Sequence, residues 1–280
     1  MALHGARLVL AFDASVVSAA RVSWGLSGPR VEACALVPLA PEALLPSPFE
    51  PNLARPEEVR AALRELRRAL GDPERGATLV LPSAVARTAV LEPPADAAPR
   101  DYARFRLAQA LPYPPSDALV DVVLLGKGRV LGAVVRRTVV AGYEEAAAAA
   151  GWKQERLDLA PLAALDGLMR RPPEGGAGVD VILGEVGFSL AVFRDGAVQA
   201  FRSRLRDRGE GDADRVQAEA ERTAAAAGLR SPRFRVVGPG ARSLIHALSF
   251  RGLSAAAGWD GPRDGMPVEA CELPWLGAAR

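Results

Sequence analysis

Histidine, cysteine and lysine are scarce in this 280-residue chain. There are two histidines, His4 and His246, and two cysteines, Cys34 and Cys271, which is too few for a structural zinc site or a disulfide framework. His4 lies close to the N-terminus, and His246 stands among apolar residues of a helical pattern, so neither suits a catalytic base. We therefore expect no metal centre and no histidine-based catalysis.

The chain also lacks a dominant charge and a long apolar run. Its 35 basic side chains are balanced by 33 acidic ones, and the arginines are scattered along the sequence. Nucleic-acid binders concentrate basic residues on one face, so this balance argues against that class. No stretch approaches the roughly 20 apolar residues of a membrane span, and the run from Leu8 to Phe12 is too short for a signal peptide. These absences predict a globular protein that is cytoplasmic as written or is the soluble portion of a longer one.

Glycine and proline are abundant and separate a series of strand-like segments. Three β-rich runs, at 8–14, 19–25 and 30–37, open the chain. The stretch "PPEGGAG" at 172–178 is typical of a linker, and a strand–turn–strand pattern restarts after it in "VILGEVGFSLAVFRDGAVQAFR". Helical patterns follow the strands in both halves, so the layout is repeated although the sequence is not. We predict two domains, at 1–172 and 179–280.

This repeated layout is the plan of the actin-like ATPase fold, and several stretches resemble one branch of it. The stretch "LVLAFDASVVSAARVSW" resembles the opening strand, aspartate-containing turn and second strand of type IV pilus assembly proteins of the PilM type. The stretches "FRLAQALPYPPSDALVDVVLL" and "RVVGPGARSL" resemble later elements of these proteins and of the cytoplasmic domain of type II secretion protein L. The resemblance spans nearly the whole chain. It implies an α/β actin-like (ribonuclease H-like) fold of two duplicated domains, with a small α+β subdomain inserted in the first at about 56–131.

The resemblance also implies a location and a partner. Proteins of this family lie on the cytoplasmic face of the inner membrane and bind the N-terminal tail of a bitopic protein of the PilN type. A motor ATPase is a further implied partner. The tail docks between the inserted subdomain and the first core subdomain, where Leu91, Leu111 and Tyr113 are the residues expected to contact it. We expect Tyr102 and Phe105, from the preceding helix, to face the core instead.

A nucleotide site between the two halves is the third implication. In actin-like ATPases the backbone N–H groups of two turns hold the phosphates, and a later glycine turn lies against the adenine and ribose. The matching positions in this chain are, turn by turn, Asp13, Ala14 and Ser15; Gly184, Glu185 and Gly187; and Gly238 and Gly240.

These turns depart from the family pattern. Ala14 carries a Cβ where the family has a residue that lets the backbone approach a phosphate, and Phe188 stands near the place of a small hydroxyl residue. Pro239 removes one N–H group from the late turn. Two interpretations remain open for the glycines, since they either bind a ligand or only form tight turns. Asp13 likewise either places Mg²⁺ or caps its turn. We expect either no cofactor or weakly bound ATP·Mg.

Catalysis is not expected. Hydrolysis of a nucleotide needs a residue that positions water, and Asp158 is the one candidate acid in the corresponding region, with a strand-end cap as its simpler role. Ser83 lacks the glycine-flanked turn of a hydrolase nucleophile. The sequence therefore predicts a non-enzymatic platform protein of a type IV pilus or type II secretion machine. The alternatives are an ATP-dependent actin-like protein of the cell-division or filament type, and a sugar-kinase-like enzyme.

Overall fold

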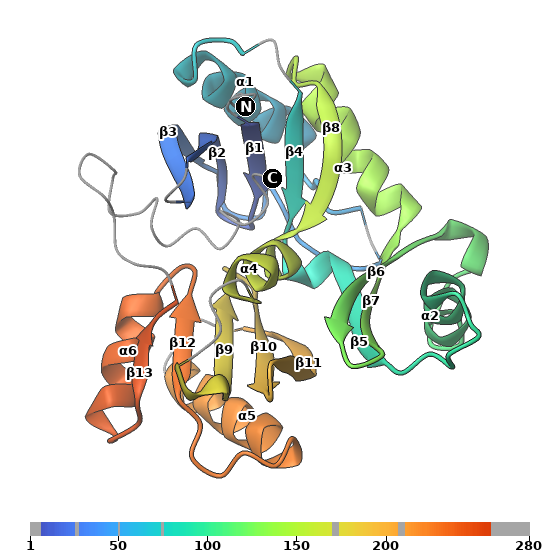
Figure 1. Cartoon of the computed structure of the whole chain (residues 1–280). Coiled ribbons are helices and arrows are strands. Elements are labelled where there is room, and N and C mark those ends of the chain that lie inside the picture. The colour runs from blue at the N-terminus through green and yellow to red at the C-terminus, as the bar shows by residue number, and fades with distance from the viewer. Residues whose placement is uncertain are drawn as a thin grey trace.

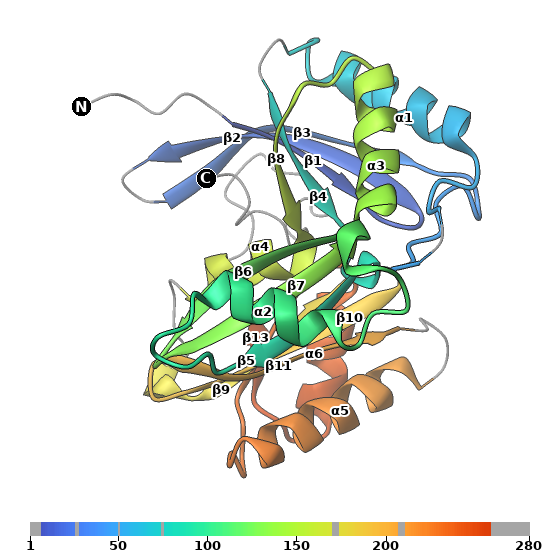
Figure 2. The ribbon, with the colours of Figure 1, turned by 90° about the vertical axis from the view of Figure 1, so that its right-hand side faces the viewer.

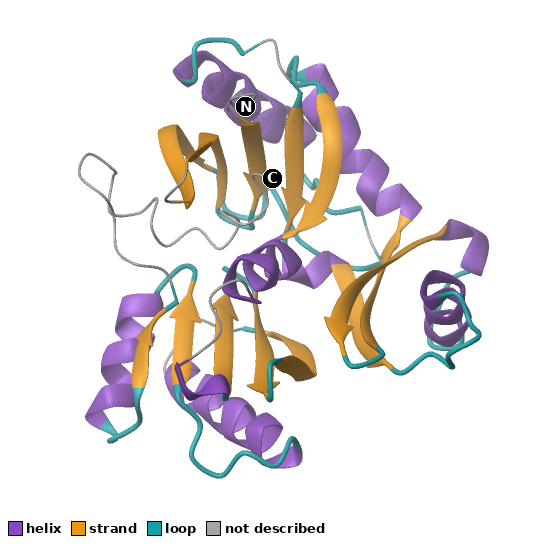
Figure 3. Cartoon of the chain, viewed as in Figure 1, coloured by secondary structure: helices purple, strands orange, loops and turns teal. Residues whose placement is uncertain are grey.

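The computed structural model describes residues 7–25, 28–49, 51–73, 76–169, 174–206 and 211–258. The described part contains three β-sheets with helices packed on their faces (Figure 3). His4 and Cys271 lie outside the described residues, as does everything after Gly258.

The first sheet is built from the opening meander and two later strands, in the order β3-β2-β1-β4-β8. The strands are β1 (Arg7–Phe12), β2 (Val16–Gly25), β3 (Gly28–Pro38), β4 (Ala77–Leu81) and β8 (Gln154–Leu159). Leu10 of β1 pairs with Ala19 in the antiparallel direction and with Leu79 in the parallel direction. The turn between β1 and β2 therefore lies at the edge of the sheet where the parallel strands end.

Two helices, α1 (Pro56–Ala69) and α3 (Arg137–Ala149), cover one face of this sheet (Figure 1). The helix α1 buries Val59, Leu63 and Leu66 at the predicted spacing, and it begins with proline followed by two glutamates. The helix α4 (Ala160–Met169) directly follows β8 and lies between the first and second sheets (Figure 1).

The second sheet repeats the plan of the first, in the order β11-β10-β9-β12-β13. Its strands are β9 (Gly178–Leu183), β10 (Gly187–Arg194), β11 (Ala197–Leu205), β12 (Phe234–Val237) and β13 (Ala255–Ala257). The 3₁₀ segment η3 (Glu174–Gly176) precedes it, and α5 (Asp212–Ala226) and α6 (Ala241–Phe250) pack on one face. Both sheets start with a three-stranded meander and extend it with two parallel strands, so the repeat expected from the sequence is present.

The third sheet forms the inserted subdomain, in the order β5-β7-β6. Its strands are β5 (Ala86–Leu91), β6 (Ala118–Gly126) and β7 (Arg129–Arg136). The 3₁₀ segment η1 (Ser83–Val85) precedes β5, and the helix α2 (Pro99–Ala108) and the 3₁₀ segment η2 (Pro115–Asp117) lie between β5 and β6 in the chain. The sheet thus spans 86–136, which corrects the expected 56–131. The reason is that α1 and β4 belong to the first core: all five residues of β4 are buried, because it lies between β1 and β8.

The prediction that Phe105 faces the core is wrong. Phe105 is 63% exposed, whereas Ala103 and Leu107 form the buried face of α2 and Tyr102 is half-buried. A Cβ at Gly132 of β7 would lie 3.1–3.3 Å from Leu107, Leu91 and Ala103, so the helix approaches the sheet closely through its smaller side chains. Steric fit, and not the aromatic residues, therefore sets which face of α2 is buried.

The inserted sheet also packs on the second half of the chain. Leu125 and Leu131 share one buried cluster with Phe193 and Phe201 of the second sheet and with Leu165 of α4. Figure 2 shows the inserted strands lying beside β11, with α2 on their outer face. The three sheets are consequently joined around α4. No helix of the described residues has both the length and the apolar character needed to cross a membrane.

Candidate functional site

The first predicted phosphate turn connects β1 to β2 and is closed by its own backbone. The N–H of Asp13 donates to the carbonyl of Val16 at 2.9 Å, and the N–H of Ala14 donates to Oδ1 of Asp13 at 2.8 Å. Ala14 does not adopt a positive φ. Ser15 is exposed, and its carbonyl accepts the N–H of Leu39 at 2.8 Å.

The second predicted phosphate turn connects β9 to β10 and meets the first turn directly. The N–H of Gly184 donates to the carbonyl of Gly187 at 2.7 Å. The N–H of Glu185 donates to Oδ2 of Asp13 at 3.1 Å, across 172 residues of sequence. One carboxylate therefore accepts an N–H group from each turn. Backbone N–H groups of such turns are natural anion-binding groups, and here they bind a carboxylate of the chain itself.

Close backbone contacts explain the glycines of the second turn, neither of which has a positive φ. A Cβ at Gly187 would lie 2.7 Å from Oγ of Ser83 and 3.1 Å from the carbonyl oxygen of Arg204. A Cβ at Gly184 would lie 3.2 Å from the carbonyl oxygen of Gly187. Contacts with the protein itself therefore leave no room for a side chain at Gly187 and little room for one at Gly184.

The glycines of the late turn have a different role. Gly238 has φ +102°, and a Cβ there would overlap the carbonyl oxygen of Leu183. Gly240 has φ +78° and precedes the first residue of α6. Both positions need left-handed backbone, which glycine adopts without steric cost. The turn lies directly against the end of β9.

An arginine that the sequence reading missed holds the second and late turns together. Nη1 of Arg206 donates to the carbonyls of Gly184 at 3.1 Å and Pro239 at 3.0 Å. Its Nε donates to Oδ2 of Asp212 at 2.8 Å, and the side chain is only 6% exposed. Nothing in the local sequence marks Arg206, because its partners come from three separate segments.

The cleft enclosed by these groups is small. A cavity of about 20 Å³ remains between the turns, lined by Asp13, Ser83, Pro161, Leu183 and Gly187 among others. One water needs about 10–15 Å³, whereas sites for ligands of nucleotide size measure roughly 300–1,000 Å³. In this conformation the cleft holds about one water molecule.

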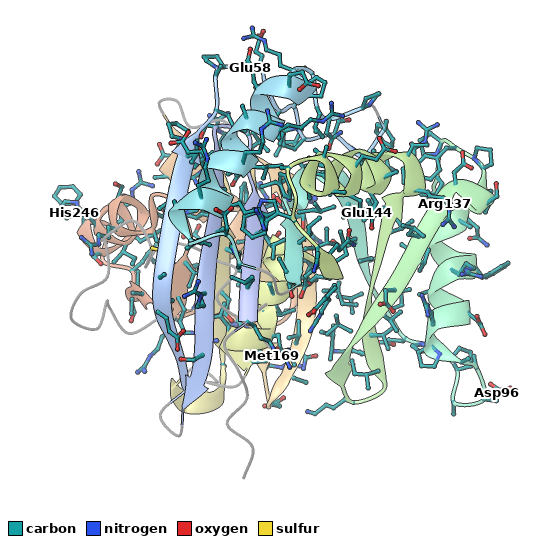
Figure 4. All side chains as sticks on the ribbon, turned by 90° about the horizontal axis from the view of Figure 1, so that it is seen from above. Glu58, Asp96, Arg137, Glu144, Met169 and His246 are labelled. Atoms are coloured by element: carbon teal, nitrogen blue, oxygen red, sulfur yellow. The ribbon has the colours of Figure 1, made fainter. Side chains whose placement is uncertain are left out.

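Two other polar groups near the cleft, Ser189 and Asp158, have partners within the protein. Ser189 is fully buried, and its Oγ lies 2.8 Å from Oγ of Ser203. Oδ1 of Asp158 accepts the N–H of Leu159 at 2.8 Å, at the boundary between β8 and α4, and burial raises the pKa of this carboxyl. His246 projects outward from α6 (Figure 4). Among the described residues no group of three or more potential metal ligands comes together.

The three predicted partner-binding residues meet on one cluster of the inserted subdomain. Leu91, Leu111 and Tyr113 are half-buried and pack against the cluster between α2 and its sheet. Tyr113 lies at the border with the first core, where the guanidinium of Arg136 sits 5.4 Å from its ring centre. The guanidinium of Arg87 sits 5.0 Å from the ring centre of Phe49. We call these four residues, Phe49, Arg87, Tyr113 and Arg136, the junction surface.

The loop that carries Phe49 is anchored from inside the core. Asn52 is buried, accepts a hydrogen bond from the hydroxyl of Tyr143 at 2.9 Å, and donates to the carbonyl of Ser47 at 2.9 Å. Burial, and then the charge of Asp13, raise the pKa of Tyr143, so this hydroxyl remains a donor. Nη1 of Arg136 donates to the carbonyl of Phe49 at 2.7 Å. The loop is therefore a fixed part of the border with the inserted subdomain.

We expect Asp13→Ala to lower the free energy of unfolding by about 1–3 kcal/mol, because two backbone N–H groups lose a charged acceptor. Urea unfolding followed by circular dichroism measures this change. Asp121→Ala is the matched control, since Asp121 also accepts the N–H of the next residue, at 2.9 Å, but is exposed and does not join the two halves. Equal effects of the two substitutions would contradict the role given to Asp13.

We expect Gly187→Ala to destabilise the protein by about 1–3 kcal/mol, because the new methyl group overlaps Ser83 and the backbone of Arg204. Adding Ser83→Ala should restore part of this loss, which a double-mutant cycle of urea unfolding detects. Gly142→Ala in α3 is the control: its nearest contact would be 3.9 Å away, so it should be neutral or stabilising. A cycle with no coupling between Gly187 and Ser83 would refute the proposed contact.

Neither a protein-family model nor a curated protein matches the sequence. Among solved structures, the chain is similar to one titled "PilM-PilN type IV pilus biogenesis complex", with 20% identity over 98% of this chain and 96% of that chain and a TM-score of 0.68. It is also similar to a Bacteroides thetaiotaomicron protein with an actin-like ATPase fold and unknown function, with 8% identity, 90% coverage of both chains and a TM-score of 0.58.

A third similar structure is the cytoplasmic domain of EpsL, an inner membrane component of the type II secretion system of Vibrio cholerae. It shares 12% identity over 98% of this chain and 94% of that chain, with a TM-score of 0.55. These likenesses confirm, at the level of the fold, the resemblance expected from the sequence. The chain has the actin-like ATPase fold, in the form shared by PilM and the EpsL cytoplasmic domain.

Proposed function

We propose that this protein is a non-enzymatic platform of a type IV pilus or type II secretion machine. In this role it binds the N-terminal cytoplasmic tail of a bitopic inner-membrane protein of the PilN type, and that partner holds it at the cytoplasmic face of the membrane. The tail binds at the junction surface, and the two halves stay closed without nucleotide. The structural similarity to a PilM–PilN complex supports the choice of partner.

The observation that carries the proposal is the composition of the junction surface. Arg87 and Arg136 lie over the rings of Phe49 and Tyr113, and no described carboxylate forms a salt bridge with either guanidinium. Nε of Arg136 is buried and has no hydrogen-bond partner in the described part of the chain. The guanidinium of Arg87 is exposed, donates to the carbonyl of Ala110 through Nη1, and has further N–H groups that can donate to the backbone carbonyl or carboxylate oxygens of an extended peptide.

The surroundings of the junction surface suit an extended apolar segment. Leu45, on the same loop as Phe49, is 51% exposed, and Leu111 lies half-buried beside Tyr113. Aromatic rings and guanidinium groups are the commonest anchors of protein interfaces. A tail lying here would contact both the first core and the inserted subdomain. Its affinity would therefore depend on the position of these two parts relative to each other.

The closed cleft supports the nucleotide-independent part of the proposal. A cavity of about 20 Å³ is too small for a nucleotide or a sugar. Opening it requires breaking the bond between Asp13 and Glu185, and the inserted subdomain is packed on both halves. Neither of the alternatives, an ATP-dependent filament protein or a sugar kinase, has a described feature in its favour.

We expect a synthetic tail peptide of the PilN-type protein from the same organism to bind the full chain, and Arg87→Ala to weaken binding about tenfold, or 1.4 kcal/mol. The loss follows from removal of one exposed guanidinium that lies over Phe49. Fluorescence anisotropy of the labelled peptide measures both affinities.

Arg137→Ala provides the matched control, because Arg137 is exposed, follows Arg136 directly and lies outside the junction surface (Figure 4). The affinity of the Arg137→Ala variant for the peptide should stay within twofold of the affinity of the unmodified protein. Absence of binding at millimolar peptide, or equal losses in the two variants, would refute the proposed site.

We expect millimolar ATP·Mg²⁺ to leave the thermal midpoint of unfolding unchanged. A ligand that binds the native state raises stability with its concentration, so a closed cleft predicts no shift. Differential scanning fluorimetry measures the midpoint, with isothermal titration calorimetry as a second readout. A saturable rise in the midpoint, present with Mg²⁺ and absent for AMP, would establish nucleotide binding and overturn this part of the proposal.

A further inference from the structure

Three arginines converge on one buried glutamate of the second domain, where β11 passes α5. Arg202 and Arg204 are two residues apart on β11 and so point to the same face of the sheet, and Arg222 comes from α5. Their guanidinium nitrogens lie 3.7, 2.9 and 2.6 Å, respectively, from the carboxylate oxygens of Glu219. We call Arg202, Arg204 and Arg222 the arginine surface.

The arginine surface carries more positive charge than Glu219 neutralises. Burial alone would raise the pKa of Glu219, but the hydrogen bond from Arg222 and the charges of Arg204 and Arg202 outweigh it and lower this pKa. The carboxylate is therefore ionised, and it balances one of three charges. It offers two oxygens to three guanidinium groups, each of which has five N–H donors.

The unused donors face solvent. The side chains of Arg202, Arg204 and Arg222 are 44%, 48% and 66% exposed, whereas that of Glu219 is 10% exposed. The carboxylate of the buried Glu219 thus holds three long arginine side chains close together. Because the three arginine side chains are already held in place, less of their conformational entropy is lost when the anionic groups of a ligand bind.

We propose that the arginine surface binds an acidic, extended segment of a partner protein, with carboxylates at alternate positions. Residues i and i+2 of a strand are separated by about 6.4–6.8 Å, so a segment with this alternation matches the spacing of Arg202 and Arg204. Arginine pairs with carboxylates through two parallel N–H···O bonds, which fixes the orientation of the segment. Arg222 closes the site from the side of α5.

A protein segment fits this surface better than a lipid bilayer does. Basic regions that bind anionic membranes usually contain roughly four to eight Lys or Arg residues, and bilayer binding also requires exposed apolar side chains. Here three arginines are offset by one glutamate, and the adjacent exposed large apolar side chain is Leu205. The charge is concentrated at one point, which suits a few carboxylates and not a broad headgroup layer.

This interaction goes beyond the binding of a membrane-protein tail. The arginine surface belongs to β11 and α5, and α5 lies at the opposite end of the molecule from α1 (Figure 1). The arginine surface shares no residue with the junction surface, so the proposal is that a second partner binds there without displacing the tail. The chain would then join two partners at once, as a platform requires.

The test uses the full chain and a labelled ten-residue peptide with three glutamates at alternate positions separated by serine. Fluorescence anisotropy at 150 mM salt should give a submillimolar dissociation constant, and the variant Arg202→Gln/Arg204→Gln should bind at least tenfold more weakly. The matched control is Arg104→Gln/Arg106→Gln, which removes two exposed arginines, also two residues apart, from α2. The control should bind within twofold of the unmodified protein, and circular dichroism checks that all proteins are folded.

Three further probes distinguish other ligands: a peptide with glutamine in place of glutamate, inorganic phosphate, and vesicles containing phosphatidylglycerol. The proposal requires that none of them matches the acidic peptide. Equal binding of the peptide to both arginine variants, binding of vesicles but not of the peptide, or no binding up to millimolar peptide would overturn it. Self-association of the Arg202→Gln/Arg204→Gln variant without peptide binding would assign the arginines to protection of an edge strand instead.

Discussion

The acceptance of two backbone N–H groups by the Asp13 carboxylate is the contact on which the arrangement of the two halves depends. It joins a turn of the first half to a turn of the second half through an anion that belongs to the chain. Charge-assisted hydrogen bonds in a small enclosed volume are stronger than the same bonds in water. At this point the contact between the halves is therefore made by the polypeptide itself. Within the second half, Arg206 fixes the second and late turns to each other.

The inserted subdomain makes this closure hard to reverse. In a two-body hinge, opening breaks only the contacts that cross the cleft. Here a third body contributes Leu125 and Leu131 to the cluster around α4 and the second sheet, and its β7 strand runs directly into α3 of the first core. Any rotation of the halves must also move this body, which carries one side of the junction surface. If a tail binds at the junction surface as proposed, its binding and the geometry of the cleft are mechanically connected.

Sequence alone predicted the order of elements, the repeated meander and the turns at Asp13 and Gly184, because these follow from local periodicity and glycine placement. It placed the start of the insertion about thirty residues too early, since nothing local shows that β4 inserts between β1 and β8. It also missed Arg206, whose partners are distant in sequence, and chose the wrong face of α2 because aromatic residues normally mark the buried side. The partner of Asp13 is the backbone of a residue in the other half, and such a contact has no sequence signature.

The hydrogen bond between Tyr143 and Asn52 has a consequence for how the loop around Phe49 can vary in evolution. The loop's path is determined by a bond on its inner side and by the pairing of Leu44 with Leu53 at its base. Its outward-facing side chains contribute little to that path. Substitutions at positions such as Leu45 can therefore accumulate without unfolding the loop, so the outer surface can change while the scaffold stays the same.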